Sequence, residues 1–230
     1  MANFPSNAAF PRSAADSRSV FITRTYTHLV AGILGFILVE LALFESGLAG
    51  QIMQFMVRLP WLVILGAFML TGWLATRTAQ TSTSIGMQYF AYAAYVVAEA
   101  LIFVPLLYIA DRKAPGTIDS AVLITALGAG GLMLVAHRTR KDFSFLRAIL
   151  MWGGVLALVA IIGGAIFGFQ LGTWFSVLMI GFAGAAVLYD TSNIINYYPE
   201  DRYVSAAMQL FASIALMFWY VLRLLMGNRS

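Results

Sequence analysis

Long apolar runs alternate with short polar segments along nearly the whole chain. Seven of these runs are long enough for a helix to cross about 30 Å of hydrocarbon, which takes roughly 20 residues. Backbone groups in lipid must be hydrogen-bonded within their own segment, so runs of this length predict helices rather than short alternating strands. The runs cover approximately residues 26–44, 59–77, 86–110, 118–136, 145–169, 172–193 and 204–226.

This pattern predicts the fold class and the domain boundaries. We expect an all-α integral membrane protein with seven transmembrane helices in one domain over residues 25–226. Residues 1–24 are polar, contain two prolines and lack the apolar core of a cleavable signal peptide, so we expect a disordered tail there. Residues 227–230 are expected to form a short C-terminal tail.

Composition agrees with a membrane protein and excludes several kinds of chemistry. Hydrophobic residues make up 61% of the chain and charged residues 10%, whereas a soluble domain carries about 25% charged residues. The net charge of +4 is small and scattered, which argues against a nucleic-acid partner and leaves the lipid bilayer as the expected surroundings. The absence of cysteine excludes disulfides, thiolate catalysis and cysteine-ligated metals.

The distribution of lysine and arginine predicts the orientation in the membrane. Nine of these residues fall on the side of the N-terminus and five on the other side, and cytoplasmic loops carry the excess. The strongest single marker is the loop HRTRKDFSFLR at residues 137–147. We therefore expect the N-terminus in the cytoplasm and, after seven spans, the C-terminus outside.

Small residues recur inside the predicted spans. Gly164 and Gly168 have the GxxxG spacing in the fifth span, and Gly181 and Gly184 have a similar spacing in the sixth. Small residues let membrane helices approach closely. We interpret them as packing positions within one bundle, and a dimer interface is the alternative.

Two glutamates lie within the predicted spans, where a carboxylate is costly and is a functional hypothesis by default. Glu40 lies near the outer end of the first span, and we interpret it as an interfacial residue. Glu99 lies in the middle of the third span, where Gln88, Tyr92, Tyr95 and Glu99 share one helical face. This polar interior stripe fits either a functional site or structural hydrogen bonding.

The third carboxylate, Asp190, lies roughly 10 Å from the inner end of the sixth span. In the last span Ser205, Gln209 and Ser213 recur at i, i+4 and i+8, which places Ser213 about 14 Å deep. Only a short loop joins the two spans, so we expect antiparallel neighbours in which Asp190 and the Ser213 face meet. Arg77 ends the second span on the same side and is the expected charge partner.

These neighbours make Asp190 a candidate switch. Burial disfavours the ionised form of a carboxylate, and a nearby arginine favours it. We therefore expect Asp190, Ser213 and Arg77 to form a pH sensor or gate. The alternative is that Asp190 only pins the helix junction through hydrogen bonds.

The segment LYDTSNII, followed by a short polar loop and YVSAAMQLFASIALMFWYVLRLL, resembles the end of the Bax inhibitor-1 family. That family includes bacterial YccA-type proteins of the inner membrane. The resemblance covers residues 24–226 in the number and spacing of spans. It implies a seven-helix fold in which the last helix is central.

The resemblance implies two activities. One is a pH-sensitive leak of cations, notably calcium, gated by an aspartate pair, and the other is modulation of a membrane-anchored ATP-dependent protease. Asp190 matches the first aspartate, but the second position holds Ser213. Arg77 corresponds loosely to an arginine that latches the pair. Asp190 is therefore the one candidate metal ligand of the pair.

Enzymes and photoreceptors are poorly supported, and no cofactor is expected. A retinal protein needs a lysine in its last helix, whereas Lys113 and Lys141 lie in loops. The chain has no HExxH zinc motif and no Gly-x-Ser-Gly nucleophile around Ser213. His28 and His137 lie near helix ends, and we interpret them as interfacial hydrogen-bonding residues.

Overall fold

The computed structural model describes residues 14–82 and 84–227, and these form a bundle of long helices without strands. The helices in this part of the chain are α1 (Ala14–Glu45), α2 (Leu48–Val57), α3 (Trp61–Thr81), α4 (Ile85–Lys113), α5 (Thr117–Thr139), α6 (Leu146–Phe167), α7 (Gly172–Asn196) and α8 (Tyr203–Gly227). All except α2 are long and apolar enough to span a membrane, which gives 7 candidate spans. The predicted fold class is confirmed.

The helix α2 is an element that the hydropathy pattern did not predict. It has 10 residues and is therefore about 15 Å long, too short to cross the hydrocarbon. It follows a turn at Gly47, whose φ of 76° is left-handed and suits glycine. The chain thus turns directly from α1 into α2, which packs back on α1 and α4.

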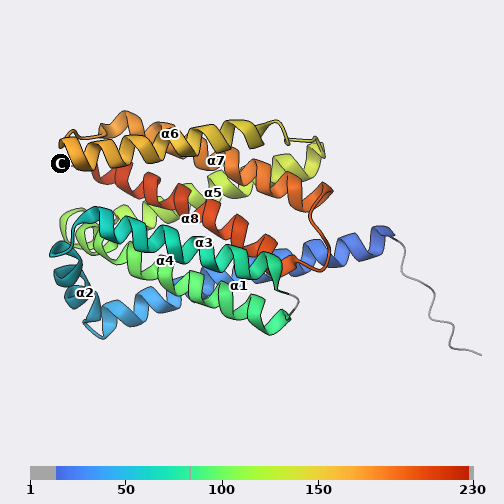
Figure 1. Cartoon of the computed structure of the whole chain (residues 1–230), viewed down its shortest axis with the longest axis horizontal. Coiled ribbons are helices and arrows are strands. Elements are labelled where there is room, and N and C mark those ends of the chain that lie inside the picture. Colours follow the sequence, from blue (N-terminus) through green and yellow to red (C-terminus); the bar gives the residue numbers. More distant parts are fainter. Residues whose placement is uncertain (1–13, 83, 228–230) are drawn as a thin grey trace, which may run out of the picture.

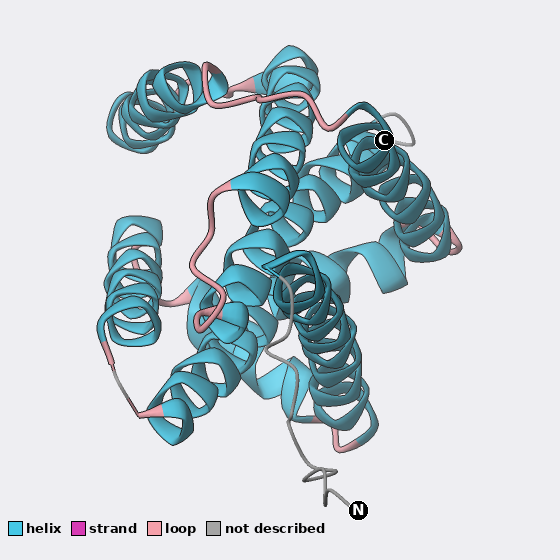
Figure 2. Cartoon of the chain, turned by 90° about the vertical axis from the view of Figure 1, so that its right-hand side faces the viewer, coloured by secondary structure: helices cyan, strands magenta, loops and turns pink. Residues whose placement is uncertain are grey.

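Successive long helices run in opposite directions, so the bundle has two ends (Figure 1). We call the end where α1 begins the N-terminal end; the α3–α4, α5–α6 and α7–α8 loops share it. The opposite, C-terminal end holds α2, the α4–α5 and α6–α7 turns and the end of α8. Figure 2 looks along the helices from the N-terminal end.

Helix α8 lies at the centre of the bundle. It packs against α1, α3, α4, α5 and α7, and its side chains Val204, Leu210 and Leu222 have no exposed surface. A helix that is apolar almost all round is expected to be buried all round. The central position that the family resemblance implied for the last helix is therefore confirmed.

Helix α6 lies at the edge of the bundle. None of its residues is buried, and it packs on α7 and touches α3. Among the predicted packing glycines, a Cβ on Gly184 would lie 3.2 Å from Leu132, and one on Gly164 would lie 3.0 Å from a backbone oxygen. Gly168, by contrast, ends α6 with a left-handed φ of 75°, and Gly181 faces open space.

The first helix begins earlier than the hydropathy pattern suggested. Residues 14–24, which were assigned to a disordered tail over 1–24, belong to α1, and residues 1–13 lie outside the described residues. Phe21 and Thr25 are buried against the bundle, so this first part of α1 is held by packing rather than by lipid.

A glycine on α1 lets α4 approach closely, and this contact gives a stability prediction. A Cβ on Gly32 would lie within 3 Å of the Tyr92 hydroxyl, which donates a hydrogen bond to the His28 carbonyl at 3.1 Å. We expect Gly32→Ala to lower the unfolding free energy by about 1–3 kcal/mol because the α1–α4 contact becomes overpacked. Gly66→Ala is the matched control, since nothing lies within 4 Å of its Cβ.

The measurement is thermal unfolding of the purified proteins in detergent. The overpacking interpretation fails if Gly32→Ala melts at the same temperature as the parent and as Gly66→Ala.

Candidate functional site

A buried carboxylate joins α7 to α8. The Gln209 side-chain amide donates to Asp190 Oδ1 at 2.7 Å, and the Ser213 hydroxyl donates to Asp190 Oδ2 at 2.5 Å. Asp190 is only 4% exposed. The structure therefore brings together the aspartate, serine and glutamine that the spacing of polar positions had placed on facing sides of the two helices.

The α7–α8 loop sets the register of this contact. The backbone N–H groups of Tyr197 and Tyr198 both donate to the Asn193 carbonyl at 2.8 Å, which ends α7. The N–H of Arg202 then donates to the Pro199 carbonyl at 3.0 Å, and α8 begins at Tyr203. A tight loop of this kind forces the two helices to run antiparallel, with Asp190 facing the first three turns of α8.

The partners of Asp190 can serve either protonation state. A serine hydroxyl and a carboxamide are each both donor and acceptor. They stabilise an ionised Asp190 by donating. A protonated Asp190 carries one hydrogen, so one of the two partners turns to accept it while the other continues to donate. No ion pair to Asp190 exists within the described residues, where the salt bridge is Arg202 to Asp201 at 3.3 Å.

Arg77 does not reach this carboxylate. Its side chain is exposed, and its guanidinium lies over the Trp73 ring, 5.1 Å from the ring centroid. Trp73 is one turn earlier on the same helix, so the long arginine side chain folds back along α3. The expected pairing of Arg77 with Asp190 is not among the contacts of the described residues.

A different arginine holds the end of α7. Arg18 on α1 donates from Nε to the Ile195 carbonyl at 3.0 Å and from a terminal nitrogen to the Tyr198 carbonyl at 2.5 Å. These are carbonyls of the last turn of α7 and of the loop after it, where a cation is favourable. Sequence reasoning missed Arg18 because it lies in a segment that was assigned to the tail.

A second arginine ties two loops at the same end. Arg202 donates to the Ser82 carbonyl at 2.6 Å, and the Gln88 side chain donates to the same carbonyl at 3.1 Å. The α7–α8 loop is thus connected to the α3–α4 loop. Within residues 14–82 and 84–227, arginine–carbonyl bonds, and not ion pairs between helices, tie the N-terminal end of the bundle together.

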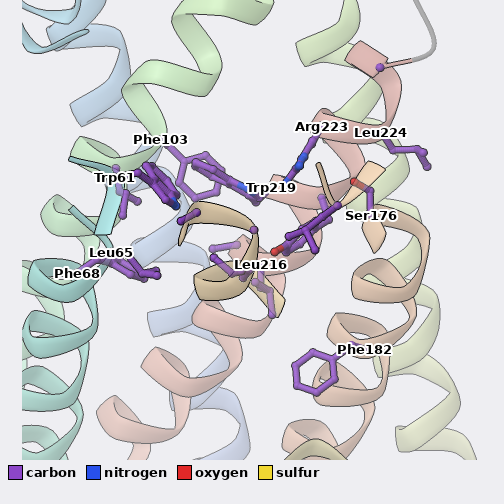
Figure 3. A pocket seen from close by; sticks show the side chains of 18 of the residues that line it. Trp61, Leu65, Phe68, Phe103, Ser176, Phe182, Leu216, Trp219, Arg223 and Leu224 are labelled. Atoms are coloured by element: carbon purple, nitrogen blue, oxygen red, sulfur yellow. The ribbon is translucent and has the colours of Figure 1, made fainter. Parts of the chain in front are cut away.

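A cavity of about 950 Å³ lies between α3, α4, α6, α7 and α8. Its wall includes Tyr95, Glu99 and Ser213, and it extends to residues at the C-terminal end such as Trp61 and Arg223 (Figure 3). The Tyr95 hydroxyl donates to Glu99 Oε1 at 2.6 Å, so these two members of the polar stripe are in contact. Ser213 therefore touches both the cavity and Asp190.

Glu40 differs from its expected interfacial position. It is 7% exposed, and neither of its carboxylate oxygens has a hydrogen-bond partner among the described residues. Helix α1 packs on α2, α4 and α8, and Glu40 lies on a buried part of α1 and not at an exposed interface. Glu40 does not line the large cavity.

His137 lies in the last turn of α5, near a helix end as expected. His28 lies in the middle of α1, because that helix begins at Ala14 and not near residue 26. His28 hydrogen-bonds the Arg24 carbonyl through Nδ1 at 2.6 Å, so Nε2 is the atom that accepts from the Tyr89 hydroxyl at 2.8 Å. The exposed His137 ring lies 5.9 Å from the Tyr26 ring. Both rings belong to the N-terminal end of the bundle and neither contacts Asp190.

Comparison with known proteins places these features in a family context. The family model described as inhibitor of apoptosis-promoting Bax1 matches residues 18–230. The chain is 33% identical over 121 residues to an uncharacterized protein of Pseudomonas aeruginosa, covering 51% of this chain and 53% of that one. It is 32% identical over 110 residues to the modulator of FtsH protease YccA of Escherichia coli, covering 44% of this chain and 50% of that one. The match thus spans about half the length of these curated relatives.

The contrast between Arg18 and Arg77 gives a prediction. Arg18→Gln shortens the side chain and removes two charge-assisted hydrogen bonds to the end of α7, so we expect local opening of residues 194–200 to become easier by on the order of 1 kcal/mol. Hydrogen exchange in that segment should then rise roughly fivefold. Arg77→Gln, which leaves those bonds intact, serves as the control.

Hydrogen exchange followed by mass spectrometry resolves this segment. Equal protection of residues 194–200 in Arg18→Gln and Arg77→Gln would contradict the assigned role of Arg18.

Proposed function

We propose that this chain, which belongs to the Bax inhibitor-1 family, is a pH-sensitive cation leak of the bacterial inner membrane with Asp190 as its titrating group. The single observation that carries the proposal is the buried Asp190 carboxylate, held by Ser213, whose other side lines a cavity reaching the C-terminal end. The N-terminal end is taken as cytoplasmic because most lysines and arginines lie on that side.

The proposed path has an open half and a closed half. From the C-terminal end, the cavity brings a cation as far as Ser213. Beyond it, the Asp190 contacts and the arginine–carbonyl bonds of Arg18 and Arg202 close the N-terminal half. Passage requires the Asp190 contacts to rearrange, and on protonation of Asp190 one of its two partners can turn from donor to acceptor.

The sign of the pH effect follows from the partners of Asp190. Ionised Asp190 attracts a cation, and protonated Asp190 does not. Burial raises the pKa of the Tyr198 phenol, the titratable group near Asp190 outside the spans, so this phenol stays neutral between pH 6 and 8. Among the described residues no arginine is paired with Asp190. Protonation of Asp190 at low pH therefore removes its attraction for a cation and breaks no ion pair that would hold the helices closed. We therefore expect more flux at pH 8 than at pH 6.

The choice of ion depends on Ser213. Calcium is bound by six to eight oxygen ligands, several of them carboxylates. Among the described residues no group of three or more histidine, aspartate or glutamate side chains could hold a metal ion. We infer that monovalent cations pass more readily than calcium in this chain and that a second carboxylate at position 213 would favour calcium.

Liposomes loaded with fluorescent reporters for potassium and calcium test the leak at pH 6 and pH 8. We expect the parent to show pH-dependent potassium flux, Asp190→Asn to lose the pH dependence, and Ser213→Asp to gain several-fold in calcium flux. Glu40→Gln is the matched control because it changes another buried carboxylate that is not part of the path.

Flux equal to that of empty liposomes at both pH values would rule out the leak. If Asp190→Asn keeps the pH dependence of the flux, the titrating group is a residue other than Asp190.

A second candidate function is regulation of a membrane-anchored protease without catalysis. The Escherichia coli relative is a modulator of FtsH protease. In this chain the α5–α6 loop is fixed against α7, because the Ser192 hydroxyl donates to the Lys141 carbonyl at 3.1 Å and accepts from the Phe143 N–H at 3.2 Å. The Tyr197 hydroxyl also donates to Asp142 at 2.8 Å. Arg138, Arg140 and Lys141 are exposed and make this surface basic, which supports a role in binding a partner.

The electrostatics of this loop keep it ordered at neutral pH. The backbone N–H of Ser144 and the Tyr197 phenol lower the pKa of Asp142. Because that pKa is lowered in the folded state, the stabilising contacts are present above the ordinary range of an aspartate and are lost as the pH falls through the lowered value. The loop should therefore be held in place throughout the physiological range.

Crosslinking in native bacterial membranes tests this second function. We expect Arg140→Gln with Lys141→Gln to reduce crosslinking to the membrane-anchored protease severalfold, because a basic exposed surface is removed. Arg112→Gln with Lys113→Gln changes the same charge at the opposite end and is the control. Protease recovery that is equal in both variants, or absent with the parent, would remove the support for this function.

A further inference from the structure

The large cavity carries two charged side chains at different depths. Among the described residues that line it, Glu99 is the acidic one and Arg223 the basic one. Glu99 lies 14 residues from either end of α4, whereas Arg223 lies four residues before the end of α8. At 1.5 Å per residue, Glu99 is about 21 Å from the C-terminal end of α4 and Arg223 is about 6 Å from that of α8. The carboxylate is therefore deep and the guanidinium is near the mouth.

Glu99 has an unused hydrogen-bonding atom. Its side chain is 5% exposed, and Oε1 accepts from the Tyr95 hydroxyl. No described group donates to Oε2, and the residue faces the cavity. An ionised carboxylate that is buried without a compensating charge is costly, so Glu99 either takes up a proton or pairs with a cation. Its open Oε2 and the adjoining cavity leave room for a cationic occupant.

The cavity wall between these charges is mainly aromatic and aliphatic. The Phe103 and Trp219 rings meet edge to face, with centroids 4.9 Å apart. Trp61, Leu65 and Phe68 of α3 line the same cavity and are labelled in Figure 3. Aromatic faces attract organic cations, and they do so more strongly when the site excludes water.

The size of the cavity distinguishes an organic from an inorganic cation. A volume of about 950 Å³ is at the upper end of the range for drug-sized ligands, roughly 300–1,000 Å³. A single metal ion would occupy a small part of it and would find few oxygen ligands. A lipid chain would fill the apolar part but would leave Glu99 Oε2 without a partner.

We propose that this cavity binds a monovalent organic cation with apolar substituents, which enters from the C-terminal end. Its charge lies at Glu99, and its apolar groups pack against Trp61, Phe103 and Trp219. Arg223 repels the cation at the mouth and so lowers its affinity. This site does not depend on a leak through Asp190.

Binding of two probes of one shape and opposite charge tests the site. Tetraphenylphosphonium and tetraphenylborate are titrated by calorimetry into the full chain in nanodiscs, and the signal of empty nanodiscs is subtracted. We expect saturable binding of the cation alone. Glu99→Gln should weaken it at least tenfold, Trp219→Leu should weaken it severalfold, and Arg223→Gln should tighten it.

The controls separate charge recognition from folding and from general apolar binding. Gln at position 99 can still accept from Tyr95, and Glu40→Gln changes a buried glutamate outside the cavity, so Glu40→Gln should bind like the parent. Equal binding of the borate, or parent-like binding in Glu99→Gln, would overturn the proposal in favour of an apolar occupant such as a lipid chain. If Glu99→Gln does not fold, unchanged affinity in both Trp219→Leu and Arg223→Gln would overturn it as well.

Discussion

The pairing of α7 with α8 depends on one constraint: a carboxylate that is 4% exposed must be satisfied without a positive charge. Neutral donors from Gln209 and Ser213 meet this requirement. An unpaired charge in the interior would cost several kcal/mol, so these two hydrogen bonds fix the rotation of α8 against α7 as well as its height. Because α8 packs against four other helices besides α7, that rotation also decides which residues of α8 face the cavity.

The same constraint explains where the arginines lie. A carboxylate satisfied by neutral groups leaves the cations free to bind backbone carbonyls, and Arg18 and Arg202 do so at the N-terminal end. Arg18 binds the Ile195 carbonyl in the last turn of α7, five residues beyond Asp190, so the loop and the buried carboxylate are stabilised separately. Opening the N-terminal end therefore requires breaking arginine–carbonyl bonds, whereas protonation of Asp190 requires only that one of its two polar partners turn from donor to acceptor.

The hydropathy pattern was sufficient to predict the seven spans, because a backbone segment in lipid must satisfy its own hydrogen bonds and therefore forms a helix. Counting residues from the α7–α8 loop was sufficient to bring Asp190 and Ser213 together, since a tight loop leaves little freedom of register. The partners of the arginines could not be predicted in the same way. Arg77 folds back on Trp73 and Arg18 binds carbonyls of α7, and in both cases the outcome depends on three-dimensional packing that a linear pattern does not contain. Glu40 was misplaced for the same reason, because the contact that buries it comes from other helices.

The two interior carboxylates near α8 differ in what surrounds them. Asp190 has both oxygens occupied and lies beyond Ser213, while Glu99 has one oxygen occupied and faces the cavity. Two aspartates in direct contact would titrate as a coupled pair, each disfavouring the ionisation of the other. Here an uncharged serine stands between the cavity and Asp190, so this direct coupling is missing. Because the two acids lie at different places, Glu99 can hold a cation in the cavity while Asp190 keeps α7 and α8 in register. Two coupled carboxylates at a single position could not perform these two roles independently.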